Sequence, residues 1–167
     1  IGHKREITAL QVNKEETLLF SGSCDNTIKI WDLANENNQF IAIKTLKFNN
    51  IWGPYELELV VKEKYLLAIL PGDAKIWNLE YDEIINLESI SPSKVLDNRK
   101  DLIYVSFGRN LLHYDLEKNE KKQILYESKD TIKMIEVSKD NKILTFLSDN
   151  YEINILNIEN LENKAHI

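Results

Sequence analysis

The stretch from Gly2-His3 to Trp31-Asp32 constrains the fold more than any other part of this chain of 167 residues. It contains short runs rich in β-branched and apolar residues, and polar turns separate them. The runs are Ile7 to Val12, Leu18 to Ser23 and Thr27 to Leu33, and a fourth follows from Phe40 to Leu46. Four strands joined by short connections predict a single antiparallel sheet at this end of the chain.

The tripeptide Trp31-Asp32-Leu33 recurs three times in degenerate form further along the chain. The copies are Trp77-Asn78-Leu79, Tyr114-Asp115-Leu116 and Leu156-Asn157-Ile158. The first residues of successive copies are 46, 37 and 42 positions apart, close to the ~40–45 residues of one blade in a β-propeller. The spacing predicts an all-β propeller of about four four-stranded antiparallel blades, with approximate bounds 1–47, 48–89, 90–128 and 129–167.

Strand-like runs also occur at most of the positions where the repeat spacing predicts strands in the later blades. Inner strands are expected at Tyr55 to Val61, near Lys94 to Leu96 and at Thr131 to Val137. Ile84 to Leu87 suits the outer strand of the second blade better than a helix, because the register leaves a vacancy there. The charged run from Glu117 to Lys122 is expected to form a solvated hairpin loop.

The segment from Gly2 to Leu33 resembles one repeat of the WD-repeat family. The resemblance implies a buried chain of hydrogen bonds, in which Trp31 donates to the hydroxyl of Ser21. It further implies that His3 bonds both that hydroxyl and the carboxylate of Asp25. Ser23 is the alternative partner if the strand is shifted.

A serine, a histidine and an aspartate in one repeat could also suggest a hydrolase triad. Ser21, however, is expected inside a strand against Trp31, and no oxyanion hole is evident, so the structural role is preferred. The later repeats lack the Gly-His pair, and apolar packing is expected to hold them. At the position of Asp25 they carry Pro71, Gly108 and Asn150, although Asp149 could serve in the fourth repeat with a shift of one residue.

Composition and charge bear on the class of partner. A net charge of −6 argues against nucleic acid, and no apolar run approaches the ~20 residues of a membrane span. The single cysteine, Cys24, excludes an internal disulfide and fits the cytoplasm. We find no glycine-rich phosphate loop and no metal-ligand spacing among the three histidines. The sequence therefore predicts neither an enzyme nor a bound cofactor or metal.

In the WD-repeat family, partners usually dock on the face made by the entry loops and the turns between second and third strands. Carried onto this chain, that face is expected to comprise Lys4, Glu6, Thr8, Cys24, Trp52, Tyr55, Arg109 and Lys133. Trp52 and Tyr55 flank a Gly-Pro turn and could anchor a partner. Packing of Trp52 between two blades is the preferred interpretation.

These features predict a non-catalytic scaffold for protein–protein interaction or a subunit of a multiprotein complex. The alternative is a reader of a small molecule or modified peptide at the central mouth of the ring, where Glu6 and Lys133 could supply charge. Four blades are fewer than the usual seven or so of this family. The remaining blades are expected from the same chain, a second copy or a partner subunit.

Overall fold

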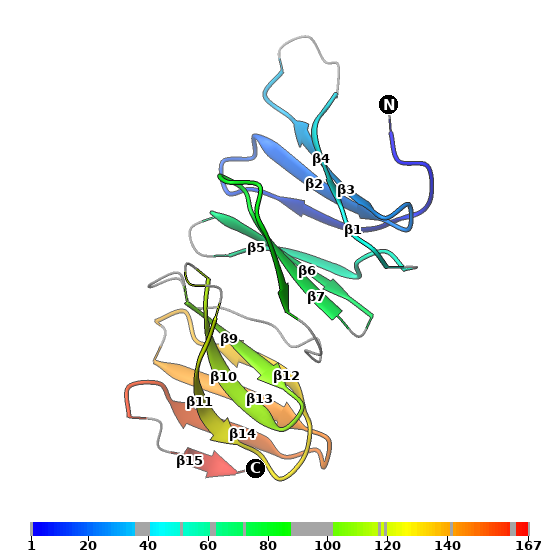
Figure 1. Ribbon diagram of the computed structural model, residues 1–167. Coiled ribbons are helices and arrows are strands. Elements are labelled where there is room, and N and C mark those ends of the chain that lie inside the picture. Colours follow the sequence, from blue (N-terminus) through cyan, green and yellow to red (C-terminus); the bar gives the residue numbers. More distant parts are fainter. Residues whose placement is uncertain are drawn as a thin grey trace.

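Four antiparallel sheets follow one another along the chain in the computed structural model (Figure 1). The structure describes residues 2–35, 41–50, 52–60, 63–71, 73–87, 102–116, 118, 120–140, 142–160 and 163–166. All regular secondary structure in these residues is β-strand. The prediction of an all-β fold built from propeller-type blades is confirmed.

The sheets are meanders, because each strand pairs with the next strand in the sequence. The first sheet contains β1 (Ile7–Val12), β2 (Leu18–Ser23), β3 (Thr27–Asp32) and β4 (Ala42–Lys47). The second contains β5 (Glu56–Val60), β6 (Tyr65–Leu70), β7 (Asp73–Asn78) and β8 (Ile84–Leu87). The third contains β9 (Leu102–Phe107), β10 (Asn110–Asp115) and β11 (Glu120–Glu127). The fourth contains β12 (Ile132–Val137), β13 (Ile143–Ser148), β14 (Ile153–Asn157) and β15 (Asn163–His166).

The third sheet differs from its expected form in two respects. The inner strand expected near Lys94 to Leu96 lies outside the described residues, so three strands are seen, in the order β11-β10-β9. The prediction of a loop from Glu117 to Lys122 is wrong in its second half, because β11 begins at Glu120 and pairs with Asp115. An edge strand tolerates such charged residues, since one of its sides faces away from the sheet.

The hydrophobic cores lie between successive sheets. Alternate residues of the first sheet, including Phe20 and Ile28, pack with Leu57 and Leu66 of the second. Tyr114 and Leu116 of the third sheet join a core with residues of the second, and Leu111 joins one with residues of the fourth. This face-to-face burial explains why the strands carry apolar side chains in alternation.

Candidate functional site

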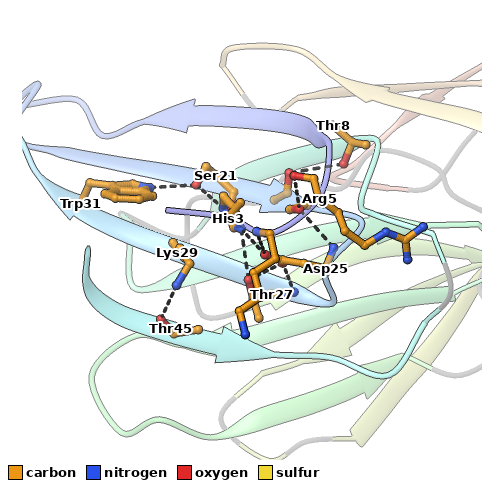
Figure 2. Close-up of polar contacts among 12 residues, drawn as sticks. His3, Arg5, Thr8, Ser21, Asp25, Thr27, Lys29, Trp31 and Thr45 are labelled. Carbon is orange, nitrogen blue, oxygen red and sulfur yellow. Dashed lines mark hydrogen bonds and ion pairs between the residues drawn. The ribbon is translucent and has the colours of Figure 1, made fainter. Parts of the chain in front are cut away.

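A polar network in the first sheet joins the segment that enters β1 to β2, β3 and the turn between them (Figure 2). The indole Nε1–H of Trp31 donates to Oγ of Ser21 across 2.8 Å. Nε2 of His3 lies 2.7 Å from the same Oγ, and Nδ1 of His3 lies 3.0 Å from Oδ2 of Asp25. A ring protonated at Nδ1 donates to the carboxylate and accepts the Ser21 hydroxyl proton at Nε2.

Asp25 is the most heavily bonded member of this network. Its carboxylate accepts hydrogen bonds from the hydroxyl of Thr27 at 2.5 Å and from the backbone N–H of Lys4 at 2.8 Å. Burial raises the pKa of Asp25, but the hydrogen bonds from Thr27, Lys4 and His3 outweigh it and hold the pKa well below its ordinary value. The group is therefore ionised at neutral pH, and it fixes the entry segment against the turn.

The Ser-His-Asp geometry resembles a hydrolase triad in its bonds but not in its access. Ser21 is 2% exposed, and the side chain of His3 is also 2% exposed. The Ser21 oxygen accepts the indole proton of Trp31, and the burial of both Ser21 and His3 keeps a substrate carbonyl from reaching it in this arrangement. The arrangement braces the sheet.

A second feature is the loop that enters the second sheet, which packs against the first. Gly53 fits closely here, because a Cβ on it would lie 2.4 Å from Oγ1 of Thr8 and 2.9 Å from the backbone N of Cys24. The hydroxyl of Thr8 donates to the carbonyl of Pro54 across 2.6 Å. The N–H of Cys24 in turn donates to the carbonyl of Glu6 at 2.9 Å.

Two aromatic side chains flank this contact and face solvent. Trp52 is 61% exposed and Tyr55 is 51% exposed. The expectation that Trp52 packs between two sheets is wrong, because Gly53 and Pro54 already occupy the contact with the first sheet. Tyr55 is anchored at its tip, since its hydroxyl donates to the carbonyl of Leu70 at 3.2 Å. Partial burial of the Tyr55 side chain, and to a lesser extent the charge of Glu56, raises the pKa of Tyr55.

These contacts bring six of the eight expected binding residues into one region, which we call the entry face. It comprises Lys4, Glu6, Thr8, Cys24, Trp52 and Tyr55. The side chains of Lys4 and Glu6 are exposed there, and Cys24 is half-buried.

The other two expected residues, Arg109 and Lys133, lie on the third and fourth sheets. Arg109 follows Gly108 in the β9–β10 turn and lies 3.5 Å from Glu127. The ammonium of Lys133 lies 2.5 Å from the carboxylate of Asp149. The hydrogen bond and charge of Asp149 raise the pKa of Lys133. The positive charge of Lys133 is thus balanced within the fourth sheet.

Sequence reasoning missed a buried polar cluster between the third and fourth sheets. Ser128, Ser148 and Asn154 are all less than 9% exposed, and Oγ of Ser148 lies 3.3 Å from the hydroxyl of Ser128 and 3.4 Å from the amide nitrogen of Asn154. Their position in the sequence could have revealed them. Ser128 lies four residues before the first strand of the fourth sheet, just as His3 lies four residues before the first strand of the first sheet.

Two further features concern metal binding and helices that could span a membrane. Within it, no three His, Cys, Asp or Glu side chains gather closely enough to hold a metal ion. None of the described segments forms a helix with the length and apolar character of a membrane span.

Residues 1–32 match the family model described as "WD domain, G-beta repeat". The chain is 26% identical over 139 residues to SIR4-interacting protein SIF2 of Saccharomyces cerevisiae, covering 79% of this chain and 25% of that protein. It is 30% identical over 106 residues to COMPASS component SWD1 of the same yeast, covering 62% of this chain and 24% of that protein. A shorter match, 46% identical over 37 residues, joins 22% of the chain to 7% of Nuclear distribution protein PAC1 of Scheffersomyces stipitis. The chain thus spans about a quarter of the length of the first two relatives.

Proposed function

We propose that this protein is a non-catalytic scaffold or a subunit of a multiprotein complex. Its residues 1–32 match the WD-domain family model. The observation that carries the proposal is the exposed pair Trp52 and Tyr55 on the entry face. Large aromatic side chains dominate the energetics of protein interfaces, and each buries much apolar area for few rotatable bonds.

The loop that bears Trp52 supports this role by its close packing. Gly53 and Pro54 are wedged against Gly22, Ser23 and Cys24 of the first sheet. A side chain presented from a fixed backbone loses less conformational entropy when a partner covers it. The entry face therefore combines an apolar anchor with the charges of Lys4 and Glu6 at its rim.

The printed names of the relatives support protein partners as the class of ligand. SIF2 is named for an interaction with SIR4, and SWD1 is named as a component of COMPASS. We propose protein partners for this chain as well, without assigning it either assembly. The cytoplasmic location and the exclusion of nucleic acid stay predictions.

We also propose that further blades cover the two end sheets, supplied by the same chain, a second copy or a partner subunit. On the outward side of the first sheet, Leu10 is 61% exposed and Val12 is 40% exposed. On the fourth sheet, Met134 is 54% exposed and Ile153 is 44% exposed, and both line an open apolar hollow of about 210 Å³. Light scattering after size exclusion tests this, because a well-folded monodisperse monomer of these 167 residues would contradict it.

The scaffold proposal is tested by affinity purification of tagged chain from a native extract of the source organism, followed by mass spectrometry. We expect Trp52→Ala to weaken the recovered interaction at least about thirty-fold, the loss typical of an interface hot spot. Tyr81→Ala is the matched control, because Tyr81 is 66% exposed but lies in the β7–β8 turn, at the end of the sheet away from Trp52. Absence of any stable protein partner, or equal losses in both variants, would overturn the proposal.

A further inference from the structure

The first and fourth sheets have the same backbone plan, shifted by 125 residues. The pair Ile7–Ser23 in the first sheet corresponds to Ile132–Ser148 in the fourth, and an irregularity follows each pair. The N–H of Cys24 bonds the carbonyl of Glu6, and the N–H of Asp149 bonds that of Thr131, both at 2.9 Å. Asn26 and Tyr151, also 125 positions apart, both have φ of 66°. Positions in the two sheets can therefore be compared one by one.

This comparison places Ser128 where the first sheet has His3. In the first sheet, the imidazole fills the space beneath the entry segment, and its Nδ1 lies 3.2 Å from Oγ1 of Thr27. In the fourth sheet, the corresponding space is a pocket of about 330 Å³. Tyr126, Ser128, Lys129, Glu152 and Asn154 line it. Glu152 stands at the position of Thr27 and Asn154 at that of Lys29, so the pocket lies over the same part of the third strand as the ring of His3. Phe146 stands at the position of Ser21, so the hydroxyl that bonds His3 is not repeated, and different groups must bind a ring here.

The inner wall of the pocket carries a buried polar atom without a hydrogen-bond partner. Asn154 is 2% exposed, and its amide nitrogen donates to Oγ of Ser148 across 3.4 Å. Its amide oxygen is buried and has no hydrogen-bond partner. The hydroxyls of Ser128 and Ser148 lie 3.3 Å apart. A buried acceptor without a partner is costly, so an N–H donor entering the pocket would relieve this cost.

The mouth of the pocket carries opposite charges. Lys129 and Glu152 are both exposed there, and the ring of Tyr126 forms a side wall that is half-buried against Phe146, with ring centroids 5.2 Å apart. Aromatic rings pack favourably beside a tyrosine ring, and the ammonium of Lys129 and the carboxylate of Glu152 attract a carboxylate and an ammonium group respectively.

We propose that this pocket binds an imidazole ring supplied by another molecule, either free histidine or a histidine side chain of a bound peptide. One ring nitrogen donates its proton to the amide oxygen of Asn154, and the other accepts the hydroxyl proton of Ser128. The pocket thus takes an external ring over the same part of the sheet as the ring of His3, but holds it by different groups. The proposal is independent of the scaffold function, because it involves none of the entry-face residues.

The test is a titration of the ¹⁵N-labelled chain with imidazole, followed by amide and side-chain chemical shifts. A pH of about 8 keeps the ring neutral. We expect shifts centred on the Asn154 side-chain amide and on Tyr126 and Ser128, with a Kd of about 1 mM for so small a ligand. The matched probe is 1-methylimidazole, whose neutral ring has no N–H to donate. It is expected to bind at least about tenfold more weakly. Equal binding of the two probes, or no shift near Asn154, would overturn the proposal.

Two variants check that the response comes from this pocket. Ser128→His places an imidazole in the space from within and is expected to abolish imidazole binding. Thr145→Ser lies on the other face of the fourth sheet and is expected to leave binding unchanged. Binding that persists in folded Ser128→His, as judged by circular dichroism, would contradict the proposal. So would a Thr145→Ser variant that loses binding to the same extent.

The source of the ring is distinguished by two further ligands. L-histidine carries both charges, whereas histidine capped at its amino and carboxyl ends carries neither and imitates a residue within a peptide. At least tenfold tighter binding of L-histidine would assign the site to the free amino acid through Lys129 and Glu152. Similar affinities would assign it to a peptide side chain. Failure of both to bind would overturn the proposal together with the imidazole result.

Discussion

Ser21→Ala tests whether the polar network of the first sheet contributes to stability through its hydrogen bonds. The side chain is 2% exposed, and the substitution removes one oxygen atom, so it leaves little cavity. The indole N–H of Trp31 loses its bond of 2.8 Å, and Nε2 of His3 loses its bond of 2.7 Å but still lies 3.1 Å from the backbone carbonyl oxygen of Ser21. A buried polar group without a partner costs about 1–3 kcal/mol, and the indole N–H is the group left without one, so we expect the free energy of unfolding to fall by about 1–3 kcal/mol.

The measurement is urea denaturation followed by far-ultraviolet circular dichroism, because tryptophan fluorescence would itself respond to the change at Trp31. A cycle with Trp31→Phe isolates the bond between Trp31 and Ser21. We expect the double variant to lose about 1–2 kcal/mol less than the sum of the single losses, since the bond can be removed only once. A loss below about 0.5 kcal/mol for Ser21→Ala, or strict additivity in the cycle, would refute this reasoning.

Three further outcomes follow from the same structure. Folding lowers the pKa of Asp25, so its contribution to stability is present above the ordinary carboxyl pKa of ~3.9 and is lost as the pH falls below that value. Between about pH 5 and 2.5, the melting temperature should therefore decrease more steeply with falling pH for the native chain than for Asp25→Asn. Gly22→Ala should reduce the free energy of unfolding by about 1–3 kcal/mol in urea, because the new Cβ would lie 2.2 Å from Cγ of Pro54; an unchanged midpoint would show that the two sheets are not packed this closely. Trp52→Ala, at a side chain 61% exposed, should change stability by less than about 0.5 kcal/mol by calorimetry, and a larger loss would mean that the indole packs within the fold.

The candidate site was predictable to different degrees in its different parts. The contacts of His3, Ser21, Asp25 and Trp31 join residues within a single repeat whose strand pairing is local. The grouping of Glu6, Thr8 and Cys24 follows from the same pairing, since β1 lies beside β2. The exposure of Trp52 did not follow from the sequence, because it depends on how Gly53 and Pro54 meet a different sheet.

The sequence by itself determined the β-strands and the order of the sheets. Alternating apolar residues, turn residues and a repeat of about forty residues act over short distances, so they specify a sheet before its neighbours are known. Only the tertiary structure decided what lies between the sheets. The pocket beside Asn154 exists because Ser128 is smaller than the histidine in the corresponding position and because Tyr126 of the third sheet closes one side. Such a space depends on contacts between residues from different sheets, which no local pattern encodes.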